Sequence, residues 1–67
     1  MRYLTKALLI KRLTLLHPKA FNPLIANIKL VNGDVTYSAA TRAVKETTSN
    51  PMERTIYFAA INKAYEA

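Results

Sequence analysis

The chain has 67 residues and no cysteine, so disulfide bridges, zinc–thiolate centres and iron–sulfur clusters are all excluded. Packing of apolar side chains therefore has to hold the fold together. Apolar residues make up 51% of the chain and charged residues 21%, a balance typical of folded rather than disordered proteins. A chain of this length, residues 1–67, is expected to form a single domain that buries only about 60% of its unfolded surface. A homodimer or a bound partner would add to its stability.

The residue inventory leaves little room for catalysis. Loops that cradle nucleotide phosphates need two or three glycines at fixed spacing, and Gly33 is the single glycine of the chain. One histidine and four carboxylates form no cluster with the spacing of metal ligands. No paired carboxylates and no nucleophile with its base stand out either. The sequence therefore predicts a protein that is not an enzyme, with no catalytic residues, no metal site and no cofactor.

Positive charge is concentrated in the first half of the chain. Residues 1–33 carry six basic side chains and no acid, whereas residues 34–67 carry four of each, and the formal net charge is +6. Such a field attracts polyanions, either nucleic acid or an anionic membrane surface. It also keeps a small protein soluble, which is the simpler explanation. The apolar run at residues 7–10 is far shorter than the roughly 20 residues of a membrane span.

Two Asn-Pro pairs indicate helix starts. Asn22 and Asn50 can accept hydrogen bonds from the first free amides of a helix, while the proline that follows each of them lacks a donor that a first turn leaves idle. After the second pair, Glu53 stands where its carboxylate can reach back to the Asn50 amide. We therefore predict that helices begin at about residues 23 and 51.

Apolar spacing predicts four short helices. The first covers about residues 3–16, the second about 23–31, the third starts from a cap at Asp34 or Thr36, and the last covers about 51–65. Gly33 closes the second helix in the left-handed conformation. An alternative places residues 28–31 and 35–37 in a β-hairpin, because Asn32-Gly33 is a strong hairpin signal. The expected fold is an all-α, compact bundle.

The two faces of the last predicted helix differ in character. Ile56, Tyr57, Ala60, Ile61 and Ala64 share one face at helical spacing, and we expect it to rest on the alanines of the third helix. Short and polar side chains occupy the opposite face, namely Thr55, Ala59, Asn62 and Glu66. Arg54, Phe58 and Lys63 lie at the borders.

Residues 24–44 resemble the first two helices of helix-turn-helix modules of the pipsqueak type and of small plasmid or phage regulators. In this run an apolar helix ends at Gly33, and Ser38 leads into Ala39-Ala40. Residues 60–64 are similar to the recognition helix of the small phage repressors called Cro. The resemblance covers residues 24–66 and implies a helix-turn-helix in which residues 44–50 form a turn longer than the usual three or four residues. It also implies a cytoplasmic regulator of transcription in a bacterial or phage-infected cell.

What the resemblance implies is a homodimer that binds double-stranded DNA. The recognition helix enters the major groove, so its outward side chains are candidate base contacts, namely Arg54, Thr55, Phe58 and Asn62. Candidate phosphate contacts are Lys6, Lys11, Arg12, Arg42, Lys45, Thr48, Ser49 and Lys63. Each of these side chains has a simpler role as a cap, a core residue or a solvated charge.

Two other function classes fit the sequence. A helical protein-interaction module, an inhibitor or adaptor, would grip a partner protein through the leucine-rich first helix at residues 1–16. The basic first segment would also suit binding to RNA or to an anionic membrane surface. The leading hypothesis is a sequence-specific DNA-binding regulator.

Overall fold

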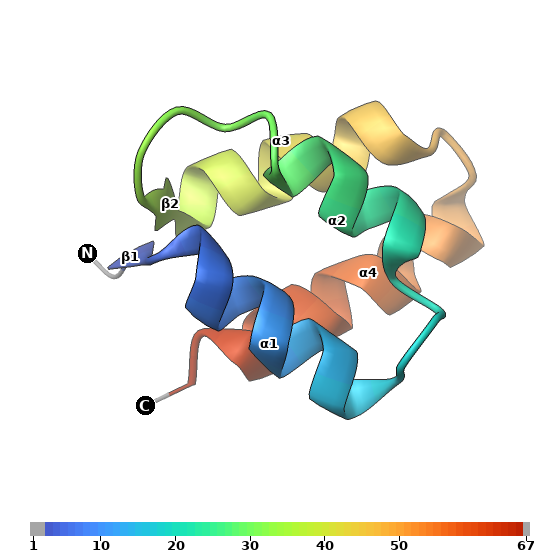
Figure 1. Ribbon diagram of the computed structural model, residues 1–67. Helices are drawn as coiled ribbons and strands as arrows, with labels where there is room; N and C mark the ends of the chain where they lie inside the picture. The colour runs from blue at the N-terminus through green and yellow to red at the C-terminus, as the bar shows by residue number, and fades with distance from the viewer. Residues whose placement is uncertain (1–2, 67) are drawn as a thin grey trace.

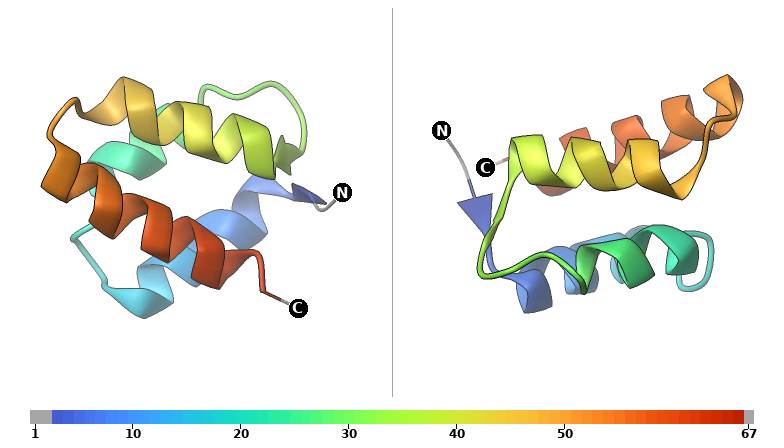
Figure 2. Two further views of the ribbon diagram at one scale, coloured as in Figure 1. Left: turned by 180° about the vertical axis from the view of Figure 1, so that it is seen from behind. Right: turned by 90° about the horizontal axis from the view of Figure 1, so that it is seen from above.

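Residues 3–66 are described by the computed structural model, and in this range the chain forms four α-helices arranged in two layers (Figure 1). The helices are α1 (Lys6–Leu16), α2 (Asn22–Ile28), α3 (Tyr37–Thr47) and α4 (Pro51–Ala64). Helices α1 and α2 make up one layer, and α3 and α4 make up the other (Figure 2). The all-α prediction is therefore confirmed, with one short β-ladder added to it. None of these helices is long and apolar enough to cross a membrane.

The β-ladder joins the start of the chain to the segment before α3. Strands β1 (Tyr3–Leu4) and β2 (Val35–Thr36) pair antiparallel, with Tyr3 opposite Thr36 and Leu4 opposite Val35. The alternative hairpin across Asn32-Gly33 is therefore wrong, because β2 pairs with β1 and not with residues 28–31. The prediction of helix from residue 3 is also wrong, since α1 begins only after Thr5. The hydroxyl oxygen of Thr5 accepts from the Leu8 amide at 3.2 Å and caps the helix.

All four helices contribute side chains to one core between the layers. Its largest fully buried members are Leu9, Leu13, Leu24, Ile28, Val35, Val44 and Ile61. Ala40 and Ala43 are also buried on α3, where their small side chains let neighbouring helices approach. Helix α4 packs against α3, and Ile61 belongs to the same buried cluster as these alanines.

One of the two predicted asparagine caps is correct. Asn50 Oδ1 accepts from the Met52 amide at 2.9 Å and from the Glu53 amide at 3.2 Å. Asn22, by contrast, is already the first residue of α2, and no side chain caps that helix. The predicted reach of Glu53 back to the Asn50 amide is wrong: its carboxylate accepts from the Thr48 hydroxyl, and Thr48 Oγ1 accepts from the Asn50 amide at 3.0 Å.

We expect Asn50→Ala to lower the free energy of unfolding by about 1 kcal/mol, because two amides at the start of α4 lose their acceptor. Asn22→Ala is the matched control. It also changes an asparagine that precedes a proline, but it removes no cap and should change the stability by less than about 0.3 kcal/mol. Urea unfolding followed by circular dichroism measures both. Equal losses would contradict the observed helix starts.

The two segments that join α2 to α3 and α3 to α4 differ from expectation. Helix α2 ends at Ile28 instead of residue 31, and residues 29–31 continue as turns before Gly33 adopts a positive φ of 80°. Helix α3 starts from a cap at Thr36, as one of the two predicted choices, and it continues to Thr47. Only residues 48–50 then lead to α4, so the predicted extended turn is wrong. Helices α3 and α4 lie side by side and run in opposite directions (Figure 2).

Candidate nucleic-acid interface

The outward side of α4 next to α3 is polar and open to solvent. Thr55, Ala59 and Asn62 are exposed, as the sequence predicted. The Tyr37 hydroxyl of α3 donates to Asn62 Oδ1, so the amide nitrogen of Asn62 is the group left to face a ligand. Thr55 donates its hydroxyl proton to Pro51 O at 2.9 Å and leaves its methyl group outside. These two side chains therefore stand in defined orientations.

A second exposed strip of α4 is apolar, which the sequence did not predict. Ile56 is 54% exposed and Met52 is 74% exposed, so Ile56 does not belong to the buried face. The reason is helix geometry: at 3.6 residues per turn, Ile56 lies about 140° around the axis from the buried Ile61. Met52, Ile56 and Ala59 follow one another along the outer surface. We call these three residues the α4 stripe.

Arg54, the candidate guanine contact, is turned toward the protein. Its Nε donates to Thr48 O at 2.7 Å and its Nη2 donates to Lys45 O at 3.1 Å. These carbonyls belong to the C-terminal end of α3, where helix carbonyls lack partners and the helix dipole is negative. Arg54 therefore holds α4 against the end of α3. In this position its guanidinium binds carbonyls of the protein and is not presented as the predicted base contact.

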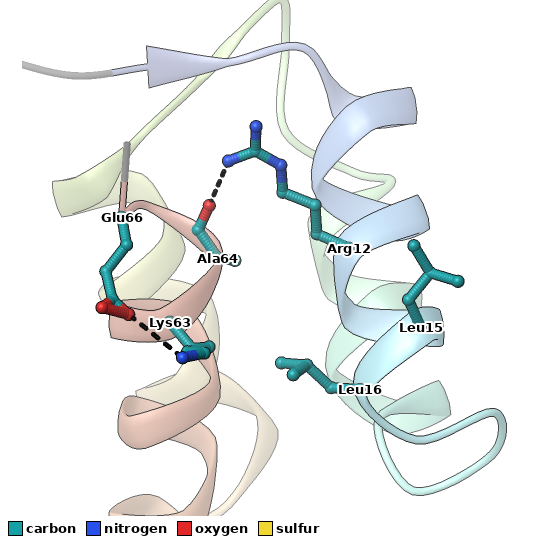
Figure 3. Close-up of a pocket in the computed structure, with 6 residues that line it drawn as sticks. All are labelled: Arg12, Leu15, Leu16, Lys63, Ala64 and Glu66. Atoms are coloured by element: carbon teal, nitrogen blue, oxygen red, sulfur yellow. Dashed lines mark hydrogen bonds and ion pairs between the residues drawn. The ribbon is translucent and has the colours of Figure 1, made fainter.

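Two further cations serve helix ends in the same way. Arg12 Nη1 donates to Ala64 O, the last residue of α4, at 2.6 Å (Figure 3). Lys6 Nζ lies 3.4 Å from Lys29 O, just after α2. Both side chains thus lie at the negative end of another helix and interact favourably with its dipole. This structural role explains a positive charge at these positions, so no phosphate contact is needed to explain it. No local sequence signal reveals these pairings, because the partners are far apart in the chain.

Of the remaining candidate contacts, three are engaged within the protein and one is open to solvent. Phe58 is half-buried and packs against the core, so it does not reach out as a base contact. Lys63 forms an exposed ion pair with Glu66 at 3.7 Å. Thr48 is engaged by Glu53 and Asn50, whereas Ser49 is exposed beside it. Of the candidates on the connection between α3 and α4, Ser49 is thus the one open to a ligand.

Arg42 and Lys45 are the cations that α3 offers to solvent. Both are exposed, and between residues 3 and 66 neither side chain has a hydrogen-bond or ion-pair partner. Helical spacing puts them on the same outer side as Ser38 and Thr41. Contacts of Tyr37 with Asn62 and of Lys45 with Arg54 bring this side next to the polar side of α4. We call the whole surface the α3–α4 face: Ser38, Thr41, Arg42, Lys45, Ser49, Thr55 and Asn62.

The structure separates the predicted phosphate contacts instead of gathering them. Lys11 is exposed on α1, which belongs to the opposite layer from Arg42 and Lys45 (Figures 1 and 2). A duplex that lies on the α3–α4 face therefore does not touch Lys11. The layer of α1 and α2 carries no acidic residue, so its positive charge would act on such a duplex only through the longer-range electrostatic field.

The comparisons with known proteins place the chain in no family. It matches no protein-family model, no curated protein and no solved structure. Within residues 3–66 there is also no group of three or more histidine or acidic side chains placed to hold a metal ion. Function therefore has to be inferred from the geometry and charge of the exposed faces.

Proposed function

We propose that this protein is a small sequence-specific DNA-binding regulator, active as a homodimer, that docks on duplex DNA through the α3–α4 face. The observation that supports this most is the pair Arg42 and Lys45, exposed and without partners among the described residues, next to hydroxyl and amide side chains. Cations with hydroxyl and amide groups beside them are what DNA-binding surfaces use for phosphates and base edges. In this proposal α3, residues 48–50 and α4 form the DNA-binding unit, and its two helices run in opposite directions instead of crossing at the roughly 90–120° of a helix-turn-helix.

Each side chain of the face has a separate role. Arg42 and Lys45 contact phosphates, and the Ser49 hydroxyl donates to a phosphate oxygen. The Asn62 amide nitrogen donates to a base acceptor in the major groove, while the Thr55 methyl group contacts a thymine methyl. Arg54 contributes by fixing α4 relative to α3 through its two main-chain acceptors. The acid-free layer of α1 and α2 adds attraction at longer range.

The decisive experiment removes equal charge from opposite layers. In Arg42→Gln/Lys45→Gln the face loses two phosphate contacts, so affinity for a 20-base-pair duplex should fall about 10-fold and the salt slope by about 2. Lys11→Gln/Lys29→Gln is the matched control, because it removes the same charge from exposed positions of the other layer. The control should lose less than about 3-fold, through the field alone. Fluorescence anisotropy at several salt concentrations measures both.

Two results would contradict the proposal. A larger loss for Lys11→Gln/Lys29→Gln would place the polyanion on the layer of α1 and α2. Failure of a random duplex library to yield any enriched sequence would remove sequence-specific recognition. Asn62→Ala distinguishes base recognition from electrostatic attraction to the phosphates. The variant should relax the base preference at one position of the enriched site, while the dependence of affinity on salt stays unchanged.

A second candidate function, protein interaction through α1, is favoured by one observation. Leu8, Leu15 and Leu16 are 37%, 74% and 44% exposed, although buried positions are the ordinary place for leucine. An inhibitor or adaptor that grips a different protein would use such a surface. It would leave the pure protein monomeric, which separates it from the homodimer tested below.

A further inference from the structure

The α4 stripe has the spacing of a helix-pairing seam. Met52, Ile56 and Ala59 are followed by Lys63, so the intervals are four, three and four residues, as in paired helices. In the monomer this seam faces solvent along most of α4. Contiguous exposed apolar side chains are a common mark of protein–protein contact sites.

Apolar surface continues from the stripe toward α1. A hollow of about 380 Å³ between α1 and α4 is lined by Leu15, Leu16 and Ala64, with Arg12, Lys63 and Glu66 at its polar positions (Figure 3). Leu16 points toward α4 in this view. A second hollow beside Ile56 is lined by Ala20 and Phe21. The α4 stripe is therefore flanked, on the side nearest α1, by hollows that side chains of a partner can enter.

We propose that the α4 stripe is the interface of a two-fold symmetric homodimer in which the two α4 helices pack antiparallel. One acid and one base beside the stripe match this arrangement, and both are exposed, although within one chain Glu53 accepts from Thr48 and Lys63 pairs with Glu66. Glu53 and Lys63 lie five positions on either side of residue 58, so an axis beside residue 58 brings Glu53 against the partner's Lys63. An axis at this level also brings Ile56 close to the partner's Ala59, the small exposed residue of the stripe. A surface that is complementary to itself in charge favours a second copy of this chain over an unrelated protein.

Such a dimer needs a modest share of the surface. Stable interfaces bury about 800 Å² on each partner, which is less than a fifth of the 4481 Å² surface of the described chain. The exposed side chains of the α4 stripe, with Leu15 and Leu16 at the end of α1, are the surface from which this area would come. An axis perpendicular to the antiparallel pair keeps both α3 helices on one side of the dimer. The two α3–α4 faces then meet the same DNA, a consequence that rests on the proposed function, whereas the dimer itself does not.

Sedimentation of the pure protein tests the interface without DNA. The monomer has a mass of 7.5 kDa, and we expect the wild-type protein to sediment as a dimer at micromolar concentration. Ile56→Glu puts a charge in the centre of the seam and should weaken dimerisation about 30-fold or more. Leu30→Glu is the matched control: Leu30 is 81% exposed but follows α2, away from α4, so the dimer should persist. Circular dichroism verifies that both variants fold.

A charge exchange tests the antiparallel register. Glu53→Lys alone places like charges opposite each other at both ends of the interface, and Lys63→Glu alone does the same with the opposite sign. Each variant should therefore be monomeric at concentrations where the wild-type protein is dimeric. An equimolar mixture of the two variants restores both attractive pairs and should form a heterodimer.

Three outcomes would overturn this interface. The first is a wild-type protein that stays monomeric at 100 times the protein concentration used for DNA binding. The second is a loss of dimer in Leu30→Glu as large as the loss in Ile56→Glu. The third is a mixture of the two charge variants that stays monomeric. A monomer that still enriches a DNA sequence would refute the dimer and leave the DNA-binding face intact. A dimer that enriches no DNA sequence would refute sequence-specific DNA binding and leave the dimer interface intact.

Discussion

Replacing Ile61 with alanine should lower the free energy of unfolding by about 3 kcal/mol, the largest effect that we expect from a single substitution in this chain. Ile61 has no exposed surface and lies in the core between the two layers. Truncation removes buried methyl and methylene groups and leaves a cavity that the short helices around it fill only in part. A domain of this size has a total stability of roughly 3–10 kcal/mol, so the variant should lose about a third of that stability or more. Urea unfolding followed by circular dichroism measures the loss.

The same change at Ile56 provides the control. Ile56 lies on the same helix but is 54% exposed, so Ile56→Ala should cost less than about 1 kcal/mol. Both variants are measured at a protein concentration low enough to keep the chain monomeric, because Ile56 also belongs to the proposed dimer seam. Equal losses at the two positions would mean that α4 is rotated about its axis relative to this structure. The α4 stripe would then be buried, and the proposed interface would fail with it.

Local signals predicted the helices well. Asn50-Pro51 indicated the start of α4, and Thr36 was one of two caps proposed for α3. Both signals depend on hydrogen bonds between a side chain and amides two or three residues away, which the sequence displays directly. Asn22-Pro23 shows the limit of such reasoning: the same pair of residue types stands inside the first turn of α2, because the preceding chain already adopts the helix start.

The rotation of α4 was harder to predict. Ile56 and Ile61 are equally apolar, and either fits an amphipathic pattern that also contains Ala60. Contacts with other helices decide which of them is buried, and a pattern within one helix does not contain that information. The same limit explains β1 and β2. Two residues on each strand give no alternating pattern, and the pairing joins Tyr3 to Thr36 across half of the chain.

The basic side chains among the candidate phosphate contacts were predicted from their charge, and charge alone does not distinguish a free cation from one that caps a helix. Arg12 reaches a carbonyl 52 residues further along the chain, so no local motif identifies that bond. Arg54 reaches back only six and nine residues, and a basic residue soon after a helix end is a usable signal for such a clamp. Glu46 lies on the same helix as Arg42 and Lys45, but among the described residues the ion pair that forms is Lys63 with Glu66, so these two cations keep no acidic partner.

Raising the pH from 10 to 12 should cost this fold about 2 kcal/mol through a single side chain, Tyr65. Tyr65 is 5% exposed at the end of α4, and its hydroxyl donates to Val35 O at 2.7 Å. Burial raises the pKa of Tyr65 from 10.0 to about 12, because the low-dielectric surroundings disfavour the phenolate. Between these two values the unfolded chain has lost the proton while the folded chain still holds it. Stability from this group is therefore complete below pH 10 and decreases until the pH passes about 12.

Tyr65→Phe isolates this contribution from the titration of every other group. At pH 7 the variant loses the hydrogen bond to Val35 O and should be about 1 kcal/mol less stable than the wild-type protein. Above pH 10 the variant has no proton to release at this position, so its deficit should shrink and then reverse by pH 12. Urea unfolding of both proteins at pH 8, 10, 11 and 12 measures the difference. A deficit that stays constant over this range would show that the Tyr65 hydroxyl is not held in the buried contact that joins α4 to β2.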